Sequence, residues 1–115
     1  MLFRVDPADS EPLFRQIAAQ VRGAIAEGRL GSGDRLPPAR ELAEALDVNM
    51  HTVLRAYGDL RDEGLVDMRR RRGVIVREAV GGRARVITAA AALAAEARRV
   101  GMARDEVVAL LEEVM

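Results

Sequence analysis

Apolar residues recur at helical spacing near the start of the chain, and these positions are Leu13, Ile17, Val21 and Ile25. Their four-residue repeat predicts an amphipathic helix over residues 11–27. Ser10 is a candidate N-cap, Pro12 is tolerated in a first helical turn, and Gly28 suits the left-handed residue that ends a helix. The preceding residues 2–6 alternate weakly and predict either an edge strand or an arm over the body.

A stretch rich in glycine and proline, residues 31–38, separates this helix from two shorter ones. The pattern predicts helices over residues 39–46 and 50–63, with Asn49 as the N-cap of the second and Gly64 at its end. The expected inward positions are Leu42, Ala43, Leu46, Val53, Ala56, Tyr57 and Leu60. Two short amphipathic helices joined by so few residues are typical of a helix-turn-helix.

Two short β-rich runs follow directly, residues 65–68 and 74–76, and they bracket four arginines with Gly73 at the bend. This arrangement predicts a two-stranded hairpin. A helix, a helix-turn-helix and a hairpin together make a winged helix. The expected fold is therefore mainly α with a small β-hairpin, and residues 1–78 form a winged helix-turn-helix DNA-binding domain.

From Gly81 onward the chain becomes rich in alanine, and the pattern predicts helices over residues 87–100 and 103–114 with a break at Gly101. We expect residues 79–115 to form a short helical hairpin for dimerisation, because such a hairpin buries too little surface to be stable alone. The candidate dimerisation residues are Leu93, Val100, Val107, Leu110, Leu111 and Val114. The alternative partner is the chain's own winged helix; a second copy would give an isologous dimer.

Composition narrows the function classes. The 115 residues carry 18 basic and 18 acidic side chains, all the basic ones arginine, so the net charge is zero. The charge is uneven, since residues 69–77 hold five arginines and no acid. No cysteine, a single histidine and no phosphate-binding loop argue against a metal site, a cofactor or an enzyme. No secretory signal or membrane span is visible, so we expect a cytoplasmic protein.

Several ordered motifs agree with a known family. They are Pro12-Leu13-Phe14-Arg15-Gln16-Ile17, Gly33-Asp34-Arg35-Leu36-Pro37-Pro38, Arg40-Glu41-Leu42-Ala43, Thr52-Val53-Leu54-Arg55-Ala56-Tyr57 and Glu63-Gly64-Leu65-Val66. Through them the chain resembles the GntR family of bacterial transcription factors over about residues 10–77. The short tail resembles the YtrA-like branch, which implies a dimeric repressor that binds a palindromic operator. The hairpin departs from the family at Arg71, where a glycine is usual, so the turn conformation there is open.

Candidate DNA contacts lie on the outward face of the second short helix, in the loop and helix before it, and in the hairpin. They are Arg35, Arg40, Asn49, Met50, His51, Thr52, Arg55, Arg69, Arg70, Arg71, Arg72 and Gly73. Base edges are read from the N-terminal part of a recognition helix, and arginine binds phosphate or guanine bidentately. We expect Asn49, His51, Thr52 and Arg55 to contact bases or phosphates, and the hairpin arginines to set affinity more than sequence choice.

Structural roles compete with these assignments. Asn49 also caps its helix, and His51 is otherwise a solvated surface residue. Arg55 and Arg40 each have an acid four residues later with which an ion pair would form on the helix surface. Arg35 is equally suited to an acid of the body.

These patterns together predict a sequence-specific regulator, a homodimeric repressor of an inverted-repeat operator. The alternatives are an architectural or plasmid-maintenance DNA-binding protein and a winged-helix module that binds another protein. Double-stranded DNA and a second copy of the chain are the expected partners. No residue requires a small-molecule effector.

Overall fold

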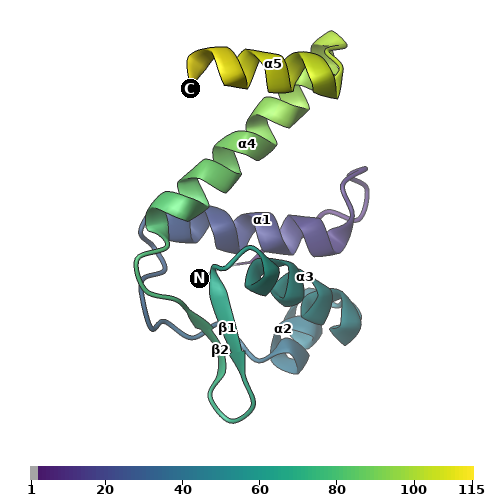
Figure 1. Cartoon of the computed structure of the whole chain (residues 1–115). Helices are drawn as coiled ribbons and strands as arrows, with labels where there is room; N and C mark the ends of the chain where they lie inside the picture. The colour runs from purple at the N-terminus through teal and green to yellow at the C-terminus, as the bar shows by residue number, and fades with distance from the viewer. Residues whose placement is uncertain (1–2) are drawn as a thin grey trace.

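The computed structural model describes residues 3–115, which form five helices and one two-stranded antiparallel hairpin (Figure 1). The elements are α1 (Leu13–Ala26), α2 (Ala39–Leu46), α3 (Met50–Asp62), β1 (Val66–Arg69), β2 (Gly73–Val76), α4 (Gly81–Val100) and α5 (Arg104–Val114). In the hairpin Val66 pairs with Val76 and Arg69 with Gly73. The expected class, mainly helical with a small hairpin, is confirmed.

Several helix ends follow the local signals, but the start of α1 does not. Asn49 caps α3, since its side chain accepts a hydrogen bond from the backbone N–H of His51 at 2.7 Å. Gly28 follows α1 with a φ of 80°. Ser10, however, is not the cap of α1: Pro12 is the N-cap, and the helix begins at Leu13. A proline disfavours helical geometry in the residue before it, so Glu11 stays outside the helix.

Helix α4 begins at Gly81, six residues earlier than the pattern predicted. Glycine is a poor helix former, so the pair Gly81 and Gly82 gave no local signal for the start of a helix. The first turns are stabilised by packing, because α4 lies against α1 and Ala84 is fully buried there. Tertiary contact thus overrides local propensity.

The segment between α1 and α2, in which the sequence showed only a break between helices, runs beside β2 and forms hydrogen bonds and an isolated bridge with it. The N–H of Leu36 donates to the carbonyl of Val74 at 2.8 Å, and the N–H of Gly33 donates to that of Val76 at 2.9 Å. Arg35 forms a bridge with Ile75. The hairpin is thereby attached to the loop that leads into α2. The pairing is non-local, so no sequence window could show it.

One hydrophobic core joins α1, α2, α3 and the hairpin. Its largest fully buried side chains are Tyr57, Ile17, Leu60, Leu65, Val21, Val53 and Val66. The Tyr57 hydroxyl donates to the carbonyl of Pro37 at 2.7 Å, and burial raises the pKa of Tyr57 well above its ordinary value. The hydroxyl therefore remains a donor, and it holds α3 against the loop before α2.

The N-terminal segment is an arm, as one of the two expectations had it. Phe3 is buried in the core, and the side chains of Gln20 and Gln16 accept hydrogen bonds from the backbone N–H groups of Arg4 and Asp6. No strand is assigned over residues 3–6; Leu2 lies outside the described residues.

The end of the chain stands away from this body (Figure 1). Helix α4 starts on α1 and rises from it, while α5 turns back from Gly101 and diverges from α4. The radius of gyration is 15.3 Å, larger than the roughly 13 Å of a compact domain of about 100 residues. No helix of the described chain is long and apolar enough to cross a membrane.

Candidate nucleic-acid interface

The N-terminus of α3 presents the residues expected to read DNA. The Asn49 cap leaves His51 exposed and Thr52 half-buried. Met50 differs from the other candidates, because its apolar side chain packs against the core. The Met50 side chain thus contributes partly to the interior. The polar side chains accessible at this helix end are those of Asn49, His51 and, in part, Thr52.

Arg55 lies one turn further along α3 and stacks on an aromatic ring. Its guanidinium carbon lies 3.8 Å from the centroid of the Phe14 ring, at the start of α1. Among residues 3–115, no ion pair joins Arg55 to Asp59. A stacked guanidinium keeps its charge and its N–H donors in the plane of the group, so the ring orients Arg55 without neutralising it.

Arg40 on α2 and Arg35 in the preceding segment are both exposed. Neither forms an ion pair with an acid of the described chain, so the surface pair of Arg40 with Glu44 is not made. Arg35 lies next to the hairpin, with its Cδ 4.0 Å from where a Cβ on Gly73 would sit. It therefore extends the positive charge of the hairpin toward α2.

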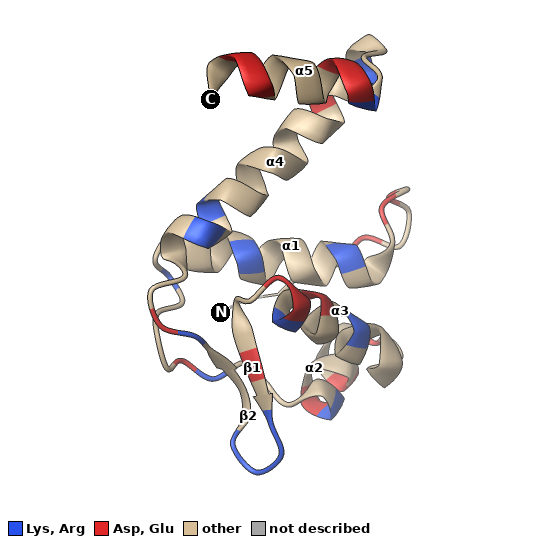
Figure 2. Ribbon diagram, in the orientation of Figure 1, with Lys and Arg blue, Asp and Glu red and all other residues tan. Residues whose placement is uncertain are grey.

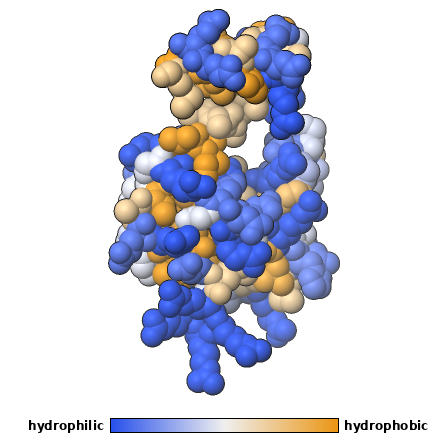
Figure 3. Space-filling model, in the orientation of Figure 1, coloured by the Kyte–Doolittle hydropathy of each residue, from blue (hydrophilic) through white to orange (hydrophobic). Residues whose placement is uncertain are grey.

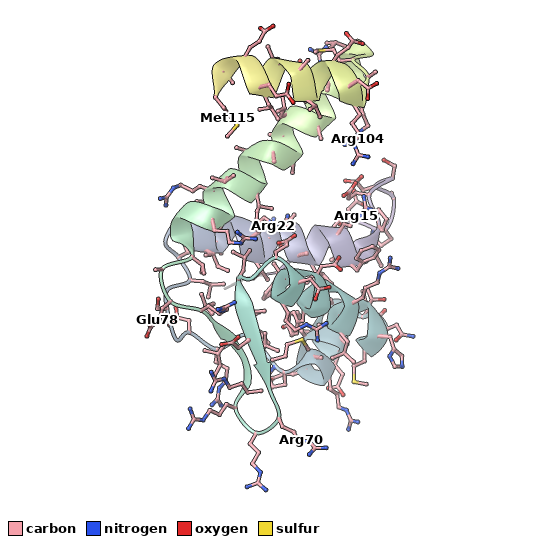
Figure 4. The ribbon with its side chains drawn as sticks, in the orientation of Figure 1. Arg15, Arg22, Arg70, Glu78, Arg104 and Met115 are labelled. Atoms are coloured by element: carbon pink, nitrogen blue, oxygen red, sulfur yellow. The ribbon has the colours of Figure 1, made fainter. Side chains whose placement is uncertain are left out.

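The hairpin tip carries the densest positive charge of the molecule (Figure 2). Arg70, Arg71 and Arg72 form the connection between β1 and β2 and are all exposed. Hydrophilic side chains project beyond the rest of the surface at the end of the molecule opposite α5 (Figure 3), and Figure 4 shows Arg70 pointing away from the body. Long exposed arginines in such a loop are free to reach phosphates or a groove.

Arg69 is held differently from the three arginines of the tip. Its Nη2 lies 3.5 Å from Oδ2 of Asp67, and Nε of Arg77 lies 3.7 Å from the other oxygen of the same carboxylate. Asp67 precedes the arginine run by two residues, just outside the acid-free stretch seen in the sequence. It offsets part of the charge at the base of the hairpin and leaves the tip positive.

The turn tolerates Arg71 without a left-handed backbone. Gly73 has a φ of 79°, whereas the non-glycine residues with positive φ in residues 3–115 are Asp47 and Ala79. The glycine present therefore takes the demanding conformation, and Arg71 carries no such strain.

The candidate dimerisation residues form an incomplete apolar cluster on α4 and α5. Leu93 and Val107 are half-buried, whereas Val100, Leu110, Leu111 and Val114 are exposed, Val114 to 72%. A groove lined by Leu93, Ala97, Val107, Val108 and Leu111 separates the two helices. Within residues 3–115 no element covers the far side of this cluster.

Three residues that position these arginines or helices were not predicted from the sequence. Phe14 was seen only as part of a motif, although an aromatic residue at the start of one helix can support an arginine on another. Glu63 and Arg83 meet at the end of α3, where Arg83 Nε donates to the Glu63 carbonyl oxygen. Nothing in their spacing pointed to this contact. No group of three or more potential metal ligands is found in the described chain.

A capped recognition helix, a preceding short helix and an arginine-tipped hairpin on one core define a winged-helix DNA-binding protein. The chain belongs to the GntR family of bacterial regulatory proteins, since the model of that family matches residues 13–76.

Curated relatives agree with this assignment. The chain is 36% identical over 77 residues to the transcriptional repressor YtrA of Bacillus subtilis, a match that covers 67% of this chain and 59% of the relative. It is 34% identical over 111 residues to the transcriptional regulator Rv1152 of Mycobacterium tuberculosis, covering 96% of this chain and 92% of the relative. The first match thus spans less than two thirds of the relative, and the second spans nearly all of it.

Solved structures show the same fold. YtrA of Sulfolobus acidocaldarius, a GntR-family transcription factor, is 39% identical with a TM-score of 0.63, covering 81% of this chain and 99% of that one. The DNA-binding domain of AraR, solved in complex with operator ORX1, is 27% identical with a TM-score of 0.56 and covers 65% of this chain and 92% of that one. The winged helix of the present chain is therefore similar to one that was solved on DNA.

Proposed function

We propose that the protein is a homodimeric transcriptional repressor that binds an inverted-repeat operator through α3 and the hairpin. The observation that carries this proposal is the set of exposed arginines without acidic partners in the described chain, on α2, α3 and the hairpin tip, around a capped helix N-terminus. Two relatives support it: one is named a repressor, and another was solved with its operator.

The two parts of the recognition surface have different tasks. On α3, His51, Thr52 and the stacked Arg55 are placed to read base edges, since side chains at the start of a recognition helix reach the major groove. The hairpin tip contributes phosphate or minor-groove contacts, which raise affinity for any sequence. Arg40 contacts the backbone from α2. The three contributions then position one winged helix on one half-site.

The dimer is proposed from the exposed apolar surface of the tail. Val100 at the C-terminal end of α4 and Leu110 and Val114 on α5 are exposed, and a second copy of the same surface would cover them. We therefore divide the chain into a DNA-binding part, residues 1–78, and a dimerisation part, residues 79–115. Two paired tails would present two recognition helices about one DNA turn, roughly 34–36 Å, apart.

Selection of bound sequences from a random pool of duplex DNA tests the proposal directly. We expect an inverted repeat whose half-sites are separated by a fixed spacing. Bound DNA without a shared motif would instead favour an architectural protein. Absence of DNA binding at low salt would favour a protein-interaction module, and either result would overturn the proposed function.

The role of the hairpin has its own measurement, the dependence of affinity on salt concentration. Replacing Arg70 by alanine removes about one phosphate contact. The negative slope of log K against log salt should therefore become less steep by about 1. The matched control is Arg29→Ala, because Arg29 lies after α1 and pairs with Glu27. An unchanged slope in Arg70→Ala would remove the hairpin tip from the interface.

A further inference from the structure

Three helices meet at the C-terminal end of the recognition helix, and Glu63 joins them. Glu63 is the C-cap of α3. Its carboxylate accepts a hydrogen bond from Nε of Arg22 on α1 at 3.0 Å, and a second from Nη2 of the same guanidinium. The two side chains are only 13% and 24% exposed. This bidentate pair fixes the end of α3 on α1.

The tail reaches the same residue from the other side. Arg83, in the first turn of α4, donates from Nε to the backbone carbonyl oxygen of Glu63. A helix C-terminus has unsatisfied carbonyls and a partial negative charge, so it attracts a cation. Gly64 follows with a φ of 80°, and a Cβ at this position would lie in contact with Arg83 Nε, at 3.4 Å. Arg83 thus caps the recognition helix from the dimerisation part of the chain.

The connection between the two parts is otherwise short and bent. The N–H of Arg77 donates to the carbonyl of Leu65 at 3.0 Å, which keeps the chain on the body just after β2. Ala79 then takes a left-handed conformation with a φ of 56°, and α4 starts two residues later. Packing of α4 on α1, where Ala84 is fully buried, holds these two helices together. The bond from Arg83 to Glu63 adds a direct contact between α4 and the end of α3.

We propose that Arg83 and Glu63 are positioning residues that set the spacing between operator half-sites which the dimer accepts. The inference rests on the proposed function, in which the tails pair and each body reads one half-site. One added base pair rotates a half-site by about 35° relative to the other, so a rigid junction accepts one spacing and a loose junction several. The Arg83–Glu63 contact makes the junction rigid.

The test separates half-site recognition from spacing. Affinities of the full chain are measured for a duplex with a single half-site and for inverted repeats with the selected spacer, one base pair less and one base pair more. Arg83→Met keeps the aliphatic stem and removes the donors. Arg85→Met is the matched control, since Arg85 is also exposed on α4 and makes no hydrogen bond to a group outside its own helix in the described chain.

For Arg83→Met we expect half-site affinity to stay within about twofold, while the preference for the selected spacer falls by about fivefold, the effect of losing one hydrogen bond. Arg83→Lys, which still offers a donor to the carbonyl, should retain most of the preference. Arg85→Met should behave as the wild type. Dimer mass and the unfolding midpoint, measured alongside, should be unchanged in all three.

The outcomes are distinct for the two proposals. A wild-type profile in Arg83→Met would overturn the positioning role, and so would equal losses in Arg83→Lys and Arg85→Met. If the wild-type chain is monomeric, or prefers no spacer, the proposed dimeric function fails before the variants are compared. A drop in half-site affinity or in the unfolding midpoint equal to the drop at the selected spacer would mean that Arg83 only stabilises the fold.

Discussion

The body and the tail of this protein differ in where their apolar side chains go. In residues 3–78 the large apolar side chains of α1 and α3 converge on one interior, where Tyr57 and Leu60 are fully buried. In the tail the corresponding stripe faces outward, and Leu110 and Val114 are 43% and 72% exposed. The large apolar side chains of the body are therefore buried within the chain, whereas several of those in the tail are exposed.

The arginines at the hairpin tip differ from those at the junction between body and tail. At the hairpin tip, Arg70, Arg71 and Arg72 are exposed and lack acidic partners in the described chain. At the junction between body and tail, Arg22 and Arg83 bind Glu63 instead. Arginine therefore serves two purposes here: at the junction it holds helices together, and at the tip it remains available for a polyanion.

The largest expected effect comes from cutting a cavity in the body. Leu60→Ala removes a fully buried side chain and should lower the free energy of unfolding by about 3 kcal/mol at any protein concentration. The matched control, Leu110→Ala in the tail, should matter only where chains associate, so its effect should depend on concentration. Urea unfolding at two widely separated concentrations measures both. Equal, concentration-independent losses would contradict the contrast between body and tail.

A charge in the apolar cluster of the tail should disrupt the dimer without affecting the DNA-binding part. Leu111→Asp places a carboxylate in the apolar groove, and we expect a monomer by sedimentation whose affinity for the inverted repeat falls by about 100-fold through lost avidity. Half-site affinity should be unchanged. Ala109→Asp adds the same charge on the opposite face of α5 and should leave the dimer intact. A dimer that survives Leu111→Asp would place the interface elsewhere.

A change on α3 should weaken binding to a half-site and leave the dimer intact. Arg55→Ala should lower half-site affinity by about 1–3 kcal/mol if its guanidinium reads a base, and leave the dimer intact. Phe14→Leu keeps an apolar side chain against the core but removes the ring under Arg55, and it should lower half-site affinity by a smaller amount. The double variant should be no worse than Arg55→Ala, because the ring acts through the arginine. Additive losses in competition binding would show that Phe14 acts independently.

The smallest effect is expected at the bend between body and tail. Ala79 has a left-handed backbone conformation, which is unfavourable for a residue with a Cβ. Ala79→Gly should therefore raise the free energy of unfolding by about 0.5–1 kcal/mol. Thermal unfolding measures the change. Ala89→Gly, in the exposed middle of α4, is the control and should lower stability by about as much, since glycine is unfavourable within a helix. A loss of stability in both would show that Ala79 is not strained.

Local signals were sufficient for much of the fold. The four-residue repeat of α1, the Asn49 cap of α3 and the runs around the hairpin arginines each act within a few residues, so the elements were predicted close to their observed bounds. The Ser10 cap failed because Pro12 moved the start of the helix. The early start of α4 was hidden for a related reason, since two glycines concealed a helix that packing stabilises.

The sequence by itself determined the order of the elements, the interior face of each helix and the placement of exposed arginine at one hairpin tip, because periodicity and turn chemistry act locally. Only the tertiary structure decided which arginines are held and which remain free. Whether Arg55 meets Asp59 or Phe14, and whether Arg83 meets solvent or Glu63, depends on contacts between residues that are 41 and 20 positions apart in the sequence. Such contacts exist only after the core has brought the helices together.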